Sequence, residues 1–305
     1  MDNKQKRHIR PFKILPITYL YHKFDYQLQA MKINTTILFF LFGITSFGQQ
    51  SSSKEEVYQI LRAHSIFHQP YMETAKNSFR NFVATHPADP YRLIASYWLA
   101  EILNKLNNSD SARLLYSQVL DMSVPDSVDD GNYRRSSAIR LAEINMADND
   151  YCAALSHLDL ARKFILRYDC GNARIEDDIR MKVLYSKCYL GQGDYRRAID
   201  TLAPCMFGSW SKDNKLIIST LYEAYLNIHT KEEIKNEFLN LEKGLVIRPE
   251  KHYSYSYFQP AVKVFDNEIE FQDHTYSLNK LTEREQKQKC METIKQSAIY
   301  KLATH

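Results

Sequence analysis

The sequence predicts an all-α protein built from stacked helix pairs, with a small β-hairpin and a terminal helix at its C-terminal end. Small residues recur twelve positions apart within segments of helical periodicity, and short polar turns divide each segment in two. Six Gly follow residue 48, which is few for a chain made of many strands and tight turns. Alternation of polar and apolar residues becomes marked after Pro249, where the small β unit is expected.

The clearest repeat is LYSKCYLGQGDYRRAIDTLAPC, residues 184–205. A small residue, a tyrosine, a turn glycine, an alanine and two apolar residues follow one another at set spacings; they are Ser186, Tyr189, Gly193, Ala198, Leu202 and Cys205. This pattern resembles a tetratricopeptide repeat, which is a pair of antiparallel helices joined by a tight turn. We therefore interpret Gly191 and Gly193 as part of a turn within a helix pair rather than a phosphate-binding loop.

Three other stretches fit the same spacing. Their matching residues are Ala63, Ile66, Ala75, Phe79, Phe82 and Pro87; Ala100, Leu103, Ala112, Tyr116 and Val119; and Ala142, Ala154, Leu158 and Ala161. A fifth, degenerate pair is expected over 216–245, where Thr230 and Glu233 form a capping box that opens the second helix. The DNDY and GQGDY segments occupy equivalent turns, and this agreement makes the series more specific than any single match.

Small residues at equivalent positions let paired helices approach closely, but one pair does not bury its apolar face, so at least three must stack. The second-helix alanines lie at 75, 112, 154 and 198, which gives steps of 37, 42 and 44 residues rather than about 34. The extra residues fall in 122–133 and 167–178. Both are rich in turn-forming residues, so we expect longer connections there and an irregular array over 54–247.

A different unit is expected over 251–305. Residues 252–278 alternate, and VKVF-DN-EIEF has the form of a two-residue hairpin with its turn at Asp266–Asn267. Residues 281–303 predict a terminal helix that caps the array, with Thr282 and Glu285 as a second capping box. Tyr253, Tyr255 and Tyr257 would share one face of a strand. They would form either an aromatic platform for a glycan or peptide, or a face packed on the last helices.

The N-terminal part has the features of a secretory signal that begins at Met31. Lys32 precedes the apolar stretch ILFFLFGI, and Ser46-Phe47-Gly48 supplies a small-x-small site, so residues 31–48 predict a signal peptide cleaved after Gly48. The run is too short for a membrane span, which needs about 20 apolar residues. An uncleaved signal-anchor or a buried helix is the alternative. Residues 1–30 are then expected to be a mis-assigned extension, or otherwise a real cytoplasmic extension.

Composition narrows the class of partner. The chain has a formal charge of +4, but residues 1–48 hold seven Lys/Arg and two Asp, and the remainder has 33 basic and 34 acidic residues. The mature chain therefore gives no reason to expect nucleic-acid binding. The five Cys form no CxxC or Cys/His cluster, and Cys188 and Cys205 are expected to be small buried hydrophobic residues. His64 and His68 are spaced so that they could chelate a metal, but the sequence offers no third ligand, so no metal site is expected. No cofactor is expected either.

No nucleotide-binding, serine-hydrolase or aspartic-protease motif is present, and we expect a non-enzymatic protein. The tetratricopeptide resemblance implies that a protein or peptide partner binds a concave surface formed by the first helix of each pair. The residues it implies are Ile60, His64, Phe67, Tyr97, Glu101, Asn104, Ile139, Glu143, Met146, Val183, Lys187 and Leu190.

The expected function is that of a periplasmic or secreted scaffold or adaptor in the envelope of a Gram-negative bacterium. One alternative is a glycan-binding accessory protein that uses the tyrosine-rich tail. Another is the sensory module of an envelope signalling system, although no membrane span or output domain follows residue 250 in this sequence. Function at this point is an analogy from the expected fold.

Overall fold

The computed structural model describes residues 53–63, 69–129, 131–164, 171–207, 214–252, 255–271 and 281–305. Residues Ser51–His305 group together as one compact unit, separate from the residues that precede them. The expected extension over 1–30 and the expected signal peptide over 31–48 both lie outside the described residues. The fold described below is that of the unit Ser51–His305.

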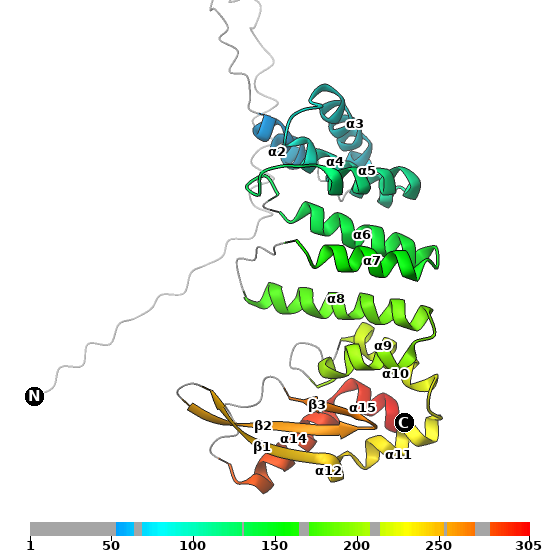
Figure 1. Cartoon of the computed structure of the whole chain (residues 1–305), viewed down its shortest axis with the longest axis vertical. Helices are drawn as coiled ribbons and strands as arrows, with labels where there is room; N and C mark the ends of the chain where they lie inside the picture. Colours follow the sequence, from blue (N-terminus) through cyan, green and yellow to red (C-terminus); the bar gives the residue numbers. More distant parts are fainter. Residues whose placement is uncertain are drawn as a thin grey trace, which may run out of the picture. The chain divides into compact units, whose positions relative to one another are not determined.

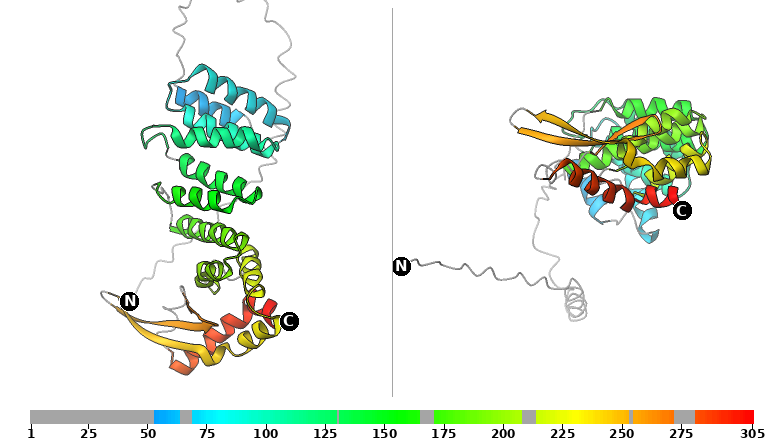
Figure 2. Two further views of the ribbon diagram at one scale, coloured as in Figure 1. Left: turned by 45° about the vertical axis from the view of Figure 1, so that its right-hand side comes forward. Right: turned by 90° about the horizontal axis from the view of Figure 1, so that it is seen from below.

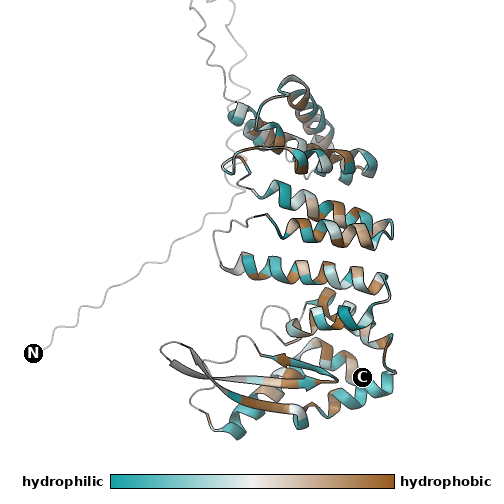
Figure 3. Ribbon diagram, viewed as in Figure 1, coloured by the Kyte–Doolittle hydropathy of each residue, from teal (hydrophilic) through white to brown (hydrophobic). Residues whose placement is uncertain are grey.

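Five helix pairs follow one another along the chain (Figure 1). Their bounds are α2 Ser53–Ala63 with α3 Gln69–Thr85, α4 Arg92–Lys105 with α5 Ser109–Asp121, α6 Tyr133–Ala147 with α7 Tyr151–Ala161, α8 Gly171–Gly191 with α9 Tyr195–Leu202, and α10 Lys215–Leu226 with α11 Lys231–Leu239. The 3₁₀ helix η1, Ala203–Cys205, extends α9. The helices carry both hydrophilic and hydrophobic residues, as expected for helices that bury one side (Figure 3).

The pairs stack because the second helix of one contacts the first helix of the next: α3 packs on α4, α5 on α6, α7 on α8 and α9 on α10. Seven of the small residues predicted at the crossings are completely buried; they are Ala75, Ala100, Ala112, Ala142, Ala154, Ser186 and Ala198. The side chain of Ala63, the remaining one, lies outside the described part. Ser186 Oγ donates a hydrogen bond of 2.8 Å to the Ala198 carbonyl, so α8 and α9 are in direct contact there. The predicted stack of helix pairs is confirmed.

Three of the turns inside these pairs share one backbone arrangement. A residue with positive φ precedes an Asn or Asp that caps the second helix: Asn107 (59°) before Asn108, Asn149 (62°) before Asp150, and Gly193 (76°) before Asp194. Each capping side chain accepts a hydrogen bond from the backbone N–H three residues further on. Asn and Gly are the residues that best tolerate positive φ. The predicted equivalence of the Asn149–Asp150 and Gly193–Asp194 turns is confirmed, and the Asn107–Asn108 turn shares their arrangement without having been predicted.

One expected connection is wrong in part. Residues 122–129 and 131–132, between α5 and α6, form no helix, but 171–178, expected within a connection, form the first two turns of α8. Asp177 in this extension accepts two hydrogen bonds of 2.6 Å from the guanidinium of Arg135 on α6. Arg135 is buried, so the pair holds the extended end of α8 against the preceding helix pair.

Among the described residues that follow α12 (Leu241–Gly244), three strands are present rather than the expected two. Strands β1 (Leu245–His252), β2 (Tyr255–Val264) and β3 (Asn267–Glu270) form an antiparallel sheet in the order β1-β2-β3. Strand β1 begins inside the range assigned to the repeats, because Leu245 and Val246 pair with Val262 and Ala261. The tight turn also differs by one residue. Val264 pairs with Asn267, which leaves Phe265–Asp266 at the turn instead of Asp266–Asn267.

The predicted terminal helix is present but is divided at Ser297 into α14 (Glu283–Gln296) and α15 (Ala298–Thr304). Both predicted capping boxes, Thr230 with Glu233 and Thr282 with Glu285, are confirmed. Side chains of α8 to α11, of the sheet and of α14 and α15 share one buried core, which includes Phe238. The short helix α12, Leu241–Gly244, leads from α11 into β1, and Figure 2 shows the sheet and the last helices beside α11.

Candidate functional site

The first helices of three pairs are joined by a ladder of charged side chains. Glu101 on α4 accepts hydrogen bonds from Nε and Nη2 of Arg140 on α6, at 2.7 and 3.0 Å. Glu143, one turn after Arg140, accepts 2.8 Å bonds from both Arg140 and Arg180 of α8. The four residues alternate in sign, so each charge has an opposite neighbour on the next helix.

The pKa of Glu143 in the ladder and that of the neighbouring Tyr97 are shifted in opposite directions. Burial is the largest influence on Glu143 and raises its pKa, but the bonds from Arg180 and Arg140 outweigh it, and the pKa lies below the usual glutamate range. Tyr97 lies beside Glu101, and burial together with that carboxylate raises the pKa of Tyr97 to about 12. Glu143 is therefore ionised and Tyr97 neutral at neutral pH.

The acidic end of the ladder is anchored in an aromatic cluster. The buried Tyr116 donates a hydrogen bond of 2.7 Å to Glu101. The ring of Tyr97 packs against those of Tyr116 and Tyr133, with centroid distances of 6.1 and 5.2 Å. These contacts involve α4, α5 and α6, so Glu101 and Tyr97 hold helices together and are poorly placed to meet a partner.

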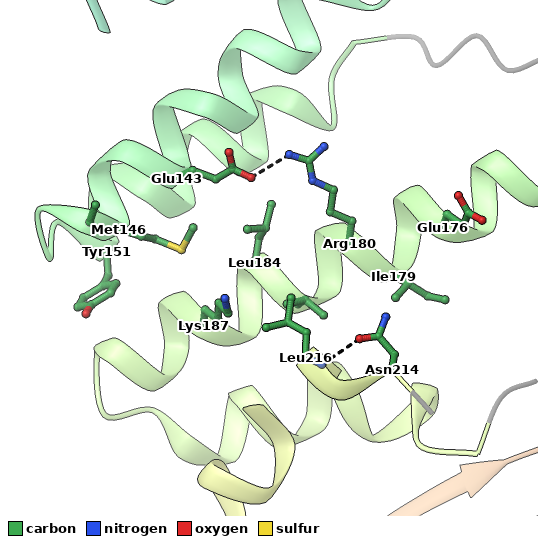
Figure 4. Close-up of a pocket in the computed structure, with 12 residues that line it drawn as sticks. Glu143, Met146, Tyr151, Glu176, Ile179, Arg180, Leu184, Lys187, Asn214 and Leu216 are labelled. Atoms are coloured by element: carbon green, nitrogen blue, oxygen red, sulfur yellow. Dashed lines mark hydrogen bonds and ion pairs between the residues drawn. The ribbon is translucent and has the colours of Figure 1, made fainter. Parts of the chain in front are cut away.

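At the α8 end of the ladder lies a pocket of about 700 Å³ (Figure 4). We call it the α8 pocket. It is lined by residues of α6 and the start of α7, of α8, and of the start of α10; they are Glu143, Met146, Ala147, Tyr151, Glu176, Ile179, Arg180, Val183, Leu184, Lys187, Asn214 and Leu216. Its volume is within the range of known ligand sites.

Local structure explains how two of these side chains reach the pocket. The ring of Tyr151 lies against Gly191, where a Cβ atom would come within 2.1 Å of the ring, so the glycine makes room for it. Asn214 caps α10 by accepting hydrogen bonds from the N–H groups of Leu216 and Ile217. That cap places Leu216 in the first turn of α10, with 46% of its surface exposed.

The four charged residues of the α8 pocket differ in whether they are paired with other side chains of the described part. Glu143 and Arg180 bond to each other, as Figure 4 shows. Glu176 and Lys187 have neither an ion pair nor a side-chain hydrogen bond within the described part of the chain. They lie towards opposite ends of the stretch of α8 that lines the pocket (Figure 4).

The twelve residues that the resemblance implied as partner-binding have different surroundings in the structure. Glu143, Met146, Val183 and Lys187 line the α8 pocket. Glu101 and Ile139 are buried, Tyr97 belongs to the aromatic cluster, and Ile60 and Leu190 pack against the cores. Asn104, near the end of α4, is half-buried. His64 and Phe67 lie outside the described residues.

The sequence predicted that Tyr253, Tyr255 and Tyr257 share one face of a strand. Tyr253 lies outside the described residues, and the backbones of Tyr255 and Tyr257 pair with His252 and Glu250 of β1. Their side chains lie outside the described part.

Sequence reasoning missed Glu176, Arg180, Tyr151 and Leu216 of the α8 pocket. The i, i+4, i+7, i+11 spacing of 176, 180, 183 and 187 was a usable signal, but the connection expected over 167–178 excluded its first member, Glu176.

Other kinds of site receive little support in the described part of the chain. No group of three or more His, Cys, Asp or Glu side chains there is suited to a metal ion, and His64 and His68 lie outside it. Cys188 and Cys205 are buried as predicted, and burial raises the pKa of the Cys188 thiol to about 11. None of the described helices combines the length and apolar character needed to cross a bilayer.

No protein-family model matches the chain, and no curated protein is similar to it in sequence. Among solved structures, it is similar to a putative kinesin light chain from Podospora anserina with nearly identical TPR-like repeats. The TM-score is 0.43 at 16% identity, over 60% of this chain and 89% of that one. The helix pairs of this chain, the contacts between their small residues and their repeated turns define its fold. The fold is a divergent tetratricopeptide-like stack of helix pairs that ends in a three-stranded sheet and two helices.

Proposed function

We propose that this protein is an exported, non-enzymatic adaptor of the bacterial envelope that binds a segment of a partner protein in the α8 pocket. The observation that carries the proposal is the composition of that pocket. Successive helix pairs contribute to it, and four of its residues were implied as partner-binding from the repeat pattern alone. Stacks of helical repeats create extended surfaces of this kind, which bind other proteins.

The chemistry of the pocket supports a peptide rather than a small metabolite. Its apolar side chains, among them Met146, Ile179 and Leu216, come from α6, α8 and α10 in turn, which suits an elongated ligand. Its charges comprise two carboxylates and two cations, so the lining has no net charge that would select a polyanion. No described feature favours the glycan-binding or sensory alternatives.

The binding proposal is tested by co-purification from an envelope extract with the wild-type protein and two matched variants. Leu216→Arg places a charge in the α8 pocket, whereas Leu226→Arg places the same charge on an exposed site of α10 that does not line it. We expect a partner that is recovered with the wild type and with Leu226→Arg, and is lost with Leu216→Arg. Equal recovery with both variants, or no specific partner, would contradict the proposal.

Export is a separate part of the proposal, supported by the signal-like sequence over 31–48. It is tested by N-terminal sequencing of protein purified from the native organism. We expect a mature chain that begins at Gln49. Recovery of intact residues 1–30 would contradict both the cleavage site and the mis-assigned start.

A further inference from the structure

Helix geometry places Glu176 and Lys187 on one face of α8. Eleven residues separate them, which is about three full turns at 3.6 residues per turn, so their Cα positions differ by only about 20° around the helix. At a rise of about 1.5 Å per residue they lie about 16 Å apart along the axis. Both line the α8 pocket, so the pocket runs along α8 from the turn of Glu176 to the turn of Lys187.

The surface between the two charges is mainly apolar. Ile179, Val183 and Leu184 come from α8, and Leu216 of α10 faces the same pocket. Val183 and Leu184 are buried, whereas Ile179 is half-buried and Leu216 is exposed. A ligand that covered Ile179 and Leu216 would remove apolar surface from water, which contributes about 25 cal/mol for each Å².

The charges inside the pocket divide into a satisfied pair and two unmatched ends. Arg180 binds Glu143 at 2.8 Å, and Glu143 also binds Arg140, so these three charges are already compensated. Glu176 is exposed and Lys187 half-buried, and neither has a partner of opposite charge within the described part. The pocket therefore offers a free carboxylate at one end of an apolar floor and a free ammonium group at the other.

Resting on the proposed function, we propose that the α8 pocket recognises an extended segment of a partner protein with one basic and one acidic side chain flanking an apolar one. The basic side chain meets Glu176, the acidic one meets Lys187, and the apolar one covers Ile179 and Leu216. Side chains four residues apart share one face of an extended chain and are separated by about 13 Å, so long side chains span the remaining distance.

The probes are four fluorescein-labelled nine-residue peptides with Gly-Ser ends and a central Leu, each carrying two charged residues four positions apart. The charges are Arg then Asp, Asp then Arg, two Arg, or two Asp, and fluorescence polarisation measures each Kd with the full chain. Solvent-facing ion pairs change affinity modestly, by about two- to fivefold each. We expect at least one mixed peptide to bind about threefold or more tightly than both like-charged peptides.

Single charge reversals make the test independent of peptide direction. With Lys187→Glu both ends are acidic, so the two-Arg peptide becomes the tightest ligand; with Glu176→Lys the two-Asp peptide does. The controls Lys243→Glu and Glu223→Lys make the same changes of net charge at exposed sites outside the pocket and keep the wild-type order. Unchanged preferences in the two pocket variants, equal binding of all four peptides, or no binding overturns the inference.

This result is separable from that of the proposed function. A partner that is lost with Leu216→Arg, combined with peptides that show no charge preference, leaves the pocket as a binding site and rejects the charge rule. Charge-dependent peptide binding without any recovered partner supports the charge rule and leaves the adaptor role contradicted by its own test.

Discussion

At the scale of single residues, the charged side chains of the first helices have two separate roles. Arg140 donates hydrogen bonds to both Glu101 and Glu143, and all three are at least half-buried, so they hold neighbouring helix pairs together. Glu176 and Lys187 remain available for a ligand. The resemblance assigned Glu101, Glu143 and Lys187 to one surface, and the contacts of each residue distinguish the charges that are paired within the fold from those that meet no opposite charge in the described part of the chain.

Replacing Glu101 by Ala should lower the free energy of unfolding by about 2 kcal/mol. The buried hydroxyl of Tyr116 loses its acceptor, and an unsatisfied buried polar group costs about 1–3 kcal/mol. Urea denaturation measures the change. Tyr116→Phe in the same chain should recover part of the loss, because the hydroxyl is then absent. Glu223→Ala, at an exposed site of α10, should change stability by less than about 0.5 kcal/mol. A Glu101→Ala effect as small as that would contradict the ladder.

The lowered pKa of Glu143 predicts a pH-dependent contribution to stability. A carboxylate whose pKa is lower in the folded than in the unfolded state stabilises the fold above its unfolded pKa, about 4.3, and loses that contribution as the pH falls through the folded value. The wild type should therefore exceed Glu143→Gln in stability at pH 7, and the difference should shrink below about pH 4. Urea denaturation across this range, with Glu223→Gln as the flat control, measures it. A difference that grows with acidity would reverse the predicted sign.

At the scale of elements, the tight turn between β2 and β3 is fixed to the last helix pairs. Phe265 has a φ of 50°, which is uncommon for a residue with a large side chain, and its ring stacks on His229 at a centroid distance of 3.8 Å. Its N–H donates to Glu237 of α11, and Asp266 pairs with Arg196 of α9 at 3.0 Å. Contacts from separate helices therefore stabilise a turn conformation that local preference disfavours.

Replacing Phe265 by Ala should lower the free energy of unfolding by about 2 kcal/mol through loss of its ring contacts with His229 and Tyr225. Phe265→Asn loses the same ring but tolerates positive φ better, so it should be about 0.5–1 kcal/mol more stable than the Ala variant. Urea denaturation of both variants measures the two effects. Equal stability of Ala and Asn would mean that the positive φ is without cost.

At the scale of the whole molecule, the C-terminal sheet and helices complete the core of the last helix pairs. The buried cluster that contains Tyr225 and Phe238 also contains Val262 and Ile269 of the sheet and Ile294 of α14. A stack of repeats exposes apolar surface at its end unless a terminal unit covers it. In this protein the sheet, α14 and α15 cover it together, whereas the sequence predicted that the terminal helix alone would do so.

Removing residues 245–305 should therefore expose the apolar side of α10 and α11. We expect increased binding of the dye ANS and faster hydrogen exchange in α8 to α11, with α4 to α7 less affected, because each repeat contacts mainly its neighbours. A chain that ends at Ala303 retains the buried side chains of α15 and is the matched control. Unchanged exchange in α10 and α11 would show that these helices do not need the C-terminal unit.

The sequence correctly predicted the features of the fold that depend on residues close together in the chain. The helix pairs, the buried small residues, the two matching turns before α7 and α9 and both capping boxes follow from spacing and residue type over a few turns of chain. The start of α8 was missed because the preference of residues 171–178 for turns was outweighed by the pairing of Asp177 with Arg135, 42 residues earlier. The turn at Phe265 was displaced by one residue for a similar reason, since its stabilising contacts come from distant helices.

For the candidate site, the sequence by itself determined which residues of each first helix share a face, and the tetratricopeptide resemblance implied that these residues bind a partner. Tertiary structure decided which charged side chains of the first helices meet an opposite charge and which do not. Glu101 is covered by Arg140, 39 residues away, and Glu143 by Arg180, 37 residues away, whereas Glu176 and Lys187 meet no opposite charge in the described part of the chain. The distance between side chains on different helices depends on how the pairs stack, and no local pattern encodes that distance.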